Sequence, residues 1–276
     1  MFVSNIEASR ILELSERQEK IRGLLAANGR VGVAELAART GVAAMTIRRD
    51  LAAMEGAGLL TRTHGGCVLQ SPFVAELSFP QKQRLRHVQK TAIAREAARL
   101  LKRGEAVYLD TGTSALQVAR VLPPGLNLKV FTNNLRVAME LFGRSDLEIV
   151  VYGGVLAAKN PDLVQEMALA HIREYRLDLA IVGGDALDVQ RGEFYGADTA
   201  TAALSRAAQK QSDRVIVVMD SSKFGKRSLA VTGRLDSGMT LITDDEVNRK
   251  NRAALRAIGV KVVYARASAG ELEGAK

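Results

Sequence analysis

The stretch Met45-Thr46-Ile47-Arg48-Arg49-Asp50-Leu51 decides how the first part of this chain folds. Its apolar residues recur at helical spacing, so the sequence predicts a helix over 44–54. A shorter amphipathic helix is predicted over 33–40, and Gly41 lies in the tight connection between the two. Two short helices joined by a glycine-containing turn are typical of a helix-turn-helix motif, which places its second helix in the major groove of DNA.

The second helix of this motif has one face for the protein core and another for a partner. Ile47, Leu51 and Met54 recur at four- and three-residue spacing, so they are expected to be buried. The residues left to meet the major groove are Thr46, Arg48 and Arg49. Arginine can pair with a guanine edge or a phosphate; the alternative is that both arginines belong to a solvated face. Asp50 is expected to hold a neighbouring arginine rather than to face the duplex.

A hairpin is predicted directly after this motif. Residues 59–61 and 67–69 form two short strands, and His64-Gly65-Gly66 supplies the positive backbone angles of a tight turn. Such a hairpin would be the wing of a winged helix, whose tip can reach phosphate or the minor groove. The wing residues expected to contact DNA are Arg62, His64 and Gly65. The alternative for His64 is a turn residue without a DNA contact.

Composition favours a partner that carries negative charge. The chain has 276 residues, 47% of them hydrophobic, which suits two domains with buried cores. Its formal net charge of +9 and its pI of about 9.8 favour a polyanion such as double-stranded DNA, although charge alone would equally fit a membrane surface. Residues 82–103 carry many basic side chains against one acid, Glu96, and we interpret them as a solvated helix face.

Several other classes of site and location are not predicted. The single cysteine, Cys67, excludes an intrachain disulfide and a thiolate-rich metal site, so a cytoplasmic protein is expected. The first residues lack the apolar core of a signal peptide, and no apolar run of about 20 residues predicts a membrane span. The three histidines are too far apart in sequence for a zinc site, and no GxGxxG fingerprint follows a strand. No metal and no cofactor is therefore predicted.

The rest of the chain alternates short apolar runs with helical patterns. This alternation predicts an α/β domain with a mostly parallel sheet covered on both faces. The predicted strands lie at 106–110, 128–132, 147–152, 179–182, 215–220, 241–243 and 260–264. A helix is predicted over 88–101 before the first of them. The predicted segments are a possible disordered extension (1–13), a winged helix-turn-helix domain (14–69, with the motif at 31–50), a linker (70–87), a ligand-sensing domain (88–266) and a tail (267–276).

Unusual residues follow five of these strands, where ligands collect in parallel sheets. Thr111 to Ser114 lie between a strand and a helix predicted over 115–121, so amides and hydroxyls converge on the positive end of that helix. Lys223 can add a full charge to the same anion. Asp110 and Asp185 would repel phosphate, so they are expected to accept hydrogen bonds from sugar hydroxyls or to brace the loops. The candidate ligand-binding residues are Asp110, Thr111, Gly112, Thr113, Ser114, Thr132, Asn133, Asn134, Gly153, Gly154, Asp185, Lys223, Phe224 and Gly225.

Residues 17–66 resemble the amino-terminal domain of DeoR-type bacterial transcriptional regulators. The resemblance rests on Thr46-Ile47-Arg48-Arg49-Asp50-Leu51 and on Arg62-Thr63-His64-Gly65-Gly66. One departure is visible, because members of the family commonly carry serine where this chain has Ala43, just before the recognition helix. Loss of a capping hydroxyl typically costs about 1 kcal/mol, so the helix start is expected to be weaker without a change of function.

The second domain resembles the DeoR-type sensor domain, which is similar in fold to ribose-5-phosphate isomerase. The motifs that carry this resemblance are Asp110-Thr111-Gly112-Thr113-Ser114, Thr132-Asn133-Asn134, Gly153-Gly154 and Asp220-Ser221-Ser222-Lys223-Phe224-Gly225. In that family the sensor binds phosphorylated sugars or related metabolites, and binding typically releases the operator. The resemblance therefore implies a regulator, in most cases a repressor, of a carbohydrate or polyol pathway. Residues 193–201 depart from the family pattern, so the pocket wall there is expected to differ.

An isomerase-like enzyme with an accessory DNA-binding domain is the competing prediction. It would need a general base near the sugar carbon, and Asp110, Asp185 and Asp188 are candidates by position only. A fused DNA-binding domain is better explained by sensing than by turnover. The predicted regulator is a homo-oligomer, a dimer or tetramer, that presents paired recognition helices to repeated half-sites.

Overall fold

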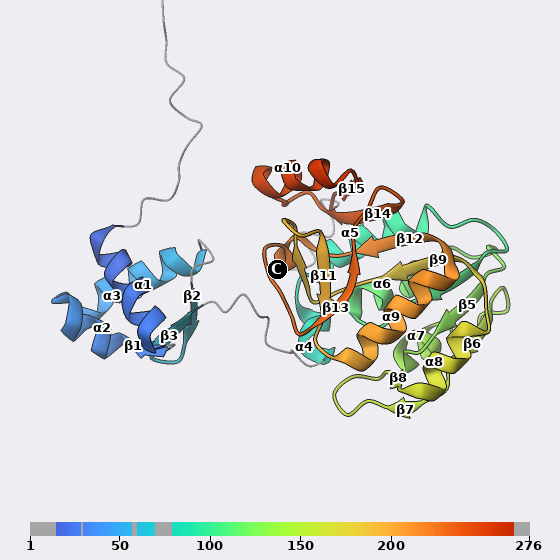
Figure 1. Ribbon diagram of the computed structural model, residues 1–276, viewed down its shortest axis with the longest axis horizontal. Coiled ribbons are helices and arrows are strands. Elements are labelled where there is room, and N and C mark those ends of the chain that lie inside the picture. Colours follow the sequence, from blue (N-terminus) through green and yellow to red (C-terminus); the bar gives the residue numbers. More distant parts are fainter. Residues whose placement is uncertain (1–14, 29, 57–59, 70–78, 268–276) are drawn as a thin grey trace, which may run out of the picture. The chain divides into compact units, whose positions relative to one another are not determined.

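The computed structural model describes residues 15–28, 30–56, 60–69 and 79–267, and the chain divides into two compact units between Ser71 and Pro72 (Figure 1). The predicted extension, 1–13, and residues 268–276 of the predicted tail lie outside the described residues. Among those described, no helix is both long and apolar enough to cross a membrane.

The first unit contains the predicted helix-turn-helix motif and wing. Its elements are α1 (Glu16–Asn28), β1 (Arg30–Gly32), α2 (Val33–Thr40), α3 (Ala44–Gly56), β2 (Leu60–Thr63) and β3 (Gly66–Leu69). The apolar face predicted for α3 is confirmed, because Ile47, Leu51 and Met54 are all buried in one cluster. The same cluster contains Ile21 and Leu25 of α1, a helix that the sequence analysis did not predict.

The wing belongs to a three-stranded antiparallel sheet with the strand order β1-β3-β2. Only Gly65 in the turn has a positive φ, of 87°, so the prediction of positive angles at His64 and Gly66 is wrong. Gly66 serves close packing instead, because a Cβ atom there would lie 2.4 Å from the carbonyl oxygen of Val31. The wing therefore rests on β1, which directly precedes the first helix of the motif.

The second unit is built on a parallel sheet, as predicted. The strand order is β15-β14-β12-β9-β4-β5-β6, and every neighbouring pair is parallel. Each predicted strand is present. Their bounds are β4 (Ala106–Leu109), β5 (Lys129–Thr132), β6 (Glu148–Val151), β9 (Leu177–Val182), β12 (Ser212–Val218), β14 (Met239–Asp244) and β15 (Lys261–Ala265).

Helices cover both faces of this sheet (Figure 1). Side chains of β4 alternate between two cores: Val107 and Leu109 lie on one face, and Tyr108 lies on the other. The first core also contains residues of α5 (His87–Ala98), α6 (Thr113–Arg120) and α7 (Leu135–Leu141), whereas the second contains residues of α8 (Glu166–Arg173), α9 (Thr199–Gln211) and α10 (Arg249–Ile258). Apolar residues therefore run almost continuously along the central strands.

Smaller elements surround the sheet, and the sequence analysis did not predict them. They are a hairpin of β7 (Val155–Leu156) and β8 (Leu163–Val164), an antiparallel sheet of β10 (Ala186–Asp188), β11 (Glu193–Gly196) and β13 (Ala230–Arg234), and a 3-10 turn, η1 (Ser221–Lys223). Helix α4 (Phe79–Arg84) lies within the predicted linker, 70–87, and its Phe79 is buried in the core of the second unit. Residues 70–78 of that linker lie outside the described residues.

Candidate DNA-binding surface and ligand pocket

Helix α3 leaves its predicted contact residues on the surface of the first unit. Arg48 and Arg49 are exposed and Thr46 is half-buried, whereas Ile47 between them is buried. Met45 is also exposed, and the sequence analysis did not include it among the contact residues. The exposed part of α3 thus offers two guanidinium groups, a hydroxyl and an apolar side chain to a partner.

Asp50 holds an arginine, as expected, but that arginine comes from α1. The Arg17 guanidinium donates to both carboxylate oxygens of Asp50, with Nε to Oδ2 at 2.5 Å and Nη2 to Oδ1 at 3.1 Å. Asp50 is buried, so the ion pair with Arg17 neutralises a carboxylate that does not lie on the exposed face of α3. Arg48 and Arg49 form no ion pair with the described residues, so both are available for DNA.

The predicted contact residues of the wing are exposed as well. Arg62, His64 and Gly65 all lie on the surface. The backbone N–H of Arg62 donates to Oε1 of Glu55 in α3 at 2.8 Å, while its guanidinium lies 4.0 Å from the other carboxylate oxygen. That ion pair is long and solvated, so the guanidinium can leave it for a phosphate at little cost.

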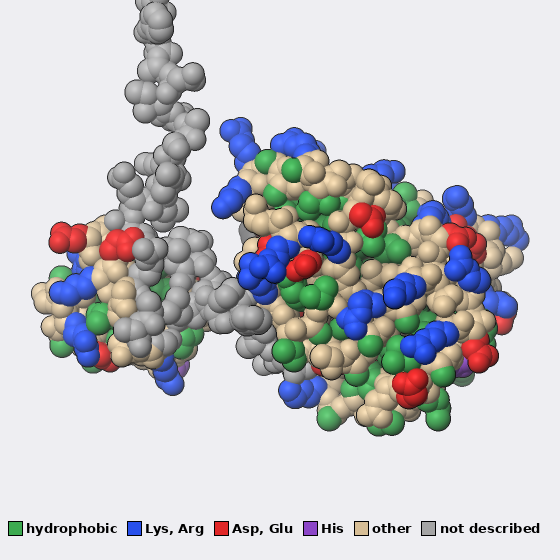
Figure 2. Space-filling view, viewed as in Figure 1, with side chains coloured by type: hydrophobic (Ala, Val, Ile, Leu, Met, Phe, Trp, Pro, Cys, Tyr) green, Lys and Arg blue, Asp and Glu red, His purple; other side chains and the backbone are tan. Residues whose placement is uncertain are grey.

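The basic side chains do not gather on the first unit alone. In Figure 2, Lys and Arg side chains are spread over the visible face of the second unit in many separate places. Part of the predicted solvated face at 82–103 is also turned inward, because Lys90 is buried and Lys82 lines a pocket. The net charge therefore does not by itself locate a DNA-binding surface.

The second unit has a pocket at the carboxyl ends of its central strands. The chain starts the sheet at β4, adds β5 and β6 on one side and then β9, β12, β14 and β15 on the other. The pocket lies at this switch point between β4 and β9, where ligands collect in doubly wound sheets. The predicted residues that line it are Asp110, Thr111, Gly112, Thr113, Ser114, Asp185 and Lys223.

The other predicted ligand residues do not line the pocket. They are Thr132, Asn133, Asn134, Gly153, Gly154, Phe224 and Gly225. Thr132 is the last residue of β5, and the next four follow β5 or β6, on the side of β4 away from β9. Asn134 is fully buried, caps α7 by accepting from the Val137 N–H at 2.9 Å, and donates to Asp162 at 2.5 Å. Phe224 belongs to the core on one face of the sheet.

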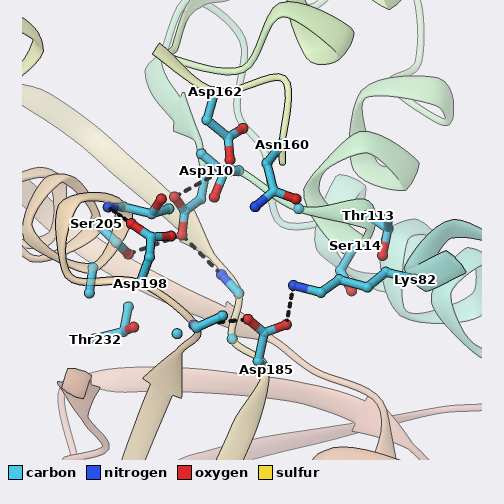
Figure 3. Close-up of a pocket in the computed structure, with 18 of the residues that line it drawn as sticks. Lys82, Asp110, Thr113, Ser114, Asn160, Asp162, Asp185, Asp198, Ser205 and Thr232 are labelled. Carbon is cyan, nitrogen blue, oxygen red and sulfur yellow. Dashed lines mark hydrogen bonds and ion pairs between the residues drawn. The ribbon is translucent and has the colours of Figure 1, made fainter. Parts of the chain in front are cut away.

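The pocket also contains residues that the sequence analysis missed (Figure 3). They come from α4 and α5, from the loop before β8, from α9 and its N-cap, and from β13, and no strand-end pattern would place them there. The polar ones are Lys82, Lys90, Asn160, Asp162, Asp198, Thr201, Ser205 and Thr232. The one available signal was the departure from the family pattern at 193–201, because Asp198 and Thr201 lie in it.

One end of the pocket suits an anion. Gly112 is the N-cap of helix α6, its φ of 96° favours glycine, and no side chain caps the first turn. The unpaired N–H groups of that turn and the helix dipole attract negative charge. Lys82 and Lys223 line the same pocket, and Nζ of Lys82 lies 2.7 Å from Oδ1 of Asp185. Burial lowers the pKa of the nearby Lys90 to about 8.

Asp110 is a brace rather than a free acid. It accepts hydrogen bonds from the Thr111 N–H at 2.8 Å, the Ser205 hydroxyl at 3.0 Å and the Gly183 N–H at 3.3 Å, and the Tyr108 hydroxyl lies 3.1 Å away. Burial raises the pKa of Asp110 to about 6, although these hydrogen bonds oppose the rise. The loops after β4 and β9 are thus joined through this carboxylate.

Together the two units define a class of protein: a helix-turn-helix domain with a wing, joined in one chain to an α/β unit with a charged pocket. The family model described as the DeoR-like helix-turn-helix domain matches residues 17–73, and that of the DeoR C terminal sensor domain matches residues 85–245. This chain belongs to the DeoR family of transcriptional regulators.

Curated relatives support the same assignment. The chain is 34% identical to the putative aga operon transcriptional repressor of Escherichia coli O157:H7, over 95% of this chain and 98% of that protein. It is 31% identical to the glycerol-3-phosphate regulon repressor of Escherichia coli strain K12, over 84% of this chain and 92% of that protein. Both relatives are named as repressors, which confirms the prediction of a regulator over that of an enzyme.

Among solved structures, ribose 5-phosphate isomerase A from Methanocaldococcus jannaschii is similar with a TM-score of 0.36 and 17% sequence identity. The match covers 49% of this chain and 53% of that protein.

Proposed function

We propose that this protein represses an operon of carbohydrate or polyol metabolism and releases its operator when a phosphorylated sugar or related metabolite occupies the pocket. The observation that carries the proposal is the uncapped first turn of α6, which shares one pocket with Lys82 and Lys223. A dianionic phosphate fits this combination of helix N-terminus and ammonium groups.

On the DNA side, the proposed contacts are those of α3 and the wing. Arg48 and Arg49 enter the major groove, while Arg62 and His64 reach the backbone or the minor groove from the wing. The relatives named as repressors support this direction of control. A homo-oligomer would present two such surfaces to repeated half-sites, and the proposed role requires a cytoplasmic location with access to the chromosome.

Binding at the ligand pocket and binding at the DNA surface affect each other if the two ligands prefer different arrangements of the protein. If the sugar phosphate binds more tightly to the arrangement that does not hold DNA, occupancy of the pocket lowers operator affinity. DNA must then lower the affinity for the sugar phosphate by the same factor.

The test is fluorescence anisotropy of the full chain on DNA from upstream of its own gene, at one fixed salt concentration, with and without a panel of sugar phosphates and glycerol 3-phosphate. Specific binding that one compound relieves supports the proposal. Binding no tighter than to random DNA, or no response to any member of the panel, contradicts it.

A matched pair of variants shows whether the pocket is the sensing site. Lys223→Ala is expected to abolish release by the active compound, since it removes a charge that lines the pocket. Lys250→Ala, an exposed lysine of α10 that does not line the pocket, is expected to respond like the parent. Equal responses of both variants would show that the compound acts elsewhere.

A further inference from the structure

The two ends of the sensor pocket carry opposite charges. Lys82, Thr113 and Ser114 lie on one side in Figure 3, next to the first turn of α6. Asp110 and Asp162 lie on the other side together with Asp198. A phosphate can bind only at the first end, because the carboxylates of the acidic end would repel it. A different group of the ligand is therefore expected at the acidic end.

No cation among the described residues forms an ion pair at the acidic end. Neither Asp110, Asp162 nor Asp198 forms a salt bridge with any described residue, whereas Asp185 nearby is paired with Lys82. Asp110 needs none, because four hydrogen-bonding groups surround it. The other two carboxylates are less well satisfied.

Of these carboxylates, Asp162 is buried and has an oxygen atom without a hydrogen-bond donor among the described residues. The residue is only 3% exposed, and its Oδ1 accepts from Nδ2 of Asn134. No group among the residues that the structure describes donates to its Oδ2, although the side chain lines the pocket. Asp198 caps α9 through Oδ1, which accepts from the Thr201 N–H at 2.8 Å, and its second oxygen likewise has no described donor.

Burial and two neighbouring carboxylates make the charge of Asp162 costly. Burial raises its pKa to about 7, and the negative charges of Asp110 and Asp198 add to the rise. A positive charge placed between these groups would remove the repulsion, whereas a neutral hydroxyl would only supply a hydrogen bond. No cluster of three or more metal-ligating side chains among the described residues could hold a metal ion, which favours an organic cation.

We propose that the effector is a zwitterion of the amino-sugar phosphate class, whose phosphate lies at the N-terminus of α6 and whose protonated amine lies between Asp162 and Asp198. This inference rests on the proposed function and narrows its ligand. The amine forms charge-assisted hydrogen bonds with the free oxygens of both carboxylates. Asp198 lies in the segment that departs from the family pattern.

Matched pairs of ligands test this proposal. Isothermal titration of the full chain compares glucosamine 6-phosphate with glucose 6-phosphate, and does the same for the galactose and mannose series. Within each pair only the amine at C2 differs from a hydroxyl. The expected result is that, in at least one pair, the amino member binds ten-fold or more tightly than its neutral counterpart.

Variants of the two carboxylates test whether the amine of the ligand lies between them. Asp162→Asn and Asp198→Asn are each expected to reduce the ratio of the two affinities by about ten-fold, because they remove a charge but keep a similar shape. Asp213→Asn is the matched control, since Asp213 is exposed, is paired with Arg176 and does not line the pocket. It is expected to leave the ratio as in the parent. An unchanged ratio in both pocket variants would overturn the assignment of the amine.

The outcomes separate this inference from the proposed function. The proposal that the ligand carries an amine is overturned if the neutral member of every pair binds equally tightly or more tightly. It is also overturned if no compound of the three series binds. Release of operator DNA by a neutral sugar phosphate or by glycerol 3-phosphate would still support the proposed function in either case. Failure of all compounds in both assays would contradict both.

Discussion

Replacing Asp162 by asparagine should stabilise the sensor unit at alkaline pH, although it removes a side chain of the pocket. The carboxyl of Asp162 is buried beside Asp110 and Asp198, and its pKa is raised from the ordinary 3.8 to about 7. An acid whose pKa is raised on folding favours the folded state at low pH, and this contribution is lost as pH rises through the folded pKa. Above pH 7 the ionised carboxylate therefore destabilises the fold.

The size of the effect follows from this shift. A change from 3.8 to about 7 corresponds to about 4 kcal/mol at pH 8, which is the upper limit of the gain. Asparagine keeps an oxygen that can accept from Asn134, but its new amide group loses some hydrogen bonding and offsets about 1 to 3 kcal/mol. We expect a net gain of about 2 kcal/mol at pH 8 that disappears near pH 4.

Urea unfolding of parent and variant between pH 4 and pH 8 measures this gain. The chain has no tryptophan, and its five tyrosines, at 108, 152, 175, 195 and 264, all lie in the second unit, so tyrosine fluorescence reports on that unit alone. Asp213→Asn is the control. A gain that is the same at pH 4 and pH 8, or a loss at pH 8, would refute the reasoning.

Four further changes are expected to have separable effects. Arg49→Ala should weaken operator binding by about 1 to 3 kcal/mol while the affinity for the sugar phosphate, measured by titration calorimetry, stays unchanged. Lys223→Ala should have the opposite effect, with parental operator affinity by anisotropy and no response to ligand. Ala43→Ser should stabilise the first unit by about 1 kcal/mol in thermal unfolding, because the Ala43 carbonyl already accepts from the first turn of α3. Gly66→Ala should lower the melting temperature of that unit by several degrees, since its methyl would collide with the backbone of Val31; equal melting temperatures would contradict this.

The fold could be predicted largely because its central elements are periodic. The apolar runs of the central strands can be recognised from the local sequence alone. The buried face of α3 is likewise marked by the helical spacing of Ile47, Leu51 and Met54. Helix α1 was missed although Ile21 and Leu25 have helical spacing. The short strands β10 and β11 were missed because neither forms a continuous apolar run: β10 ends in Asp188, and β11 begins with Glu193 and ends in Gly196.

The pocket was only partly predictable, because strand ends alone do not give strand order. The residues after β4 and β9 meet at the switch point, but those after β5 and β6 lie on the other side of β4. Asn134 is thus a buried cap of α7 and does not line the pocket. Lys82 and Asp162 enter from a helix and a loop far away in the sequence, so only the tertiary fold places them together.

The packing of the wing has a consequence for how DNA is read. The Gly65 carbonyl accepts a hydrogen bond from the N–H of Val33, the first residue of α2, at 2.8 Å, and Gly66 lies opposite Gly32 in the sheet. The wing and the helix pair are therefore joined by backbone hydrogen bonds before any DNA is bound, so their contact does not have to form upon binding. An operator must match the recognition helix and the wing at the same time. Inserting a single base pair between their two contact points should thus weaken binding more than changing the base at either one.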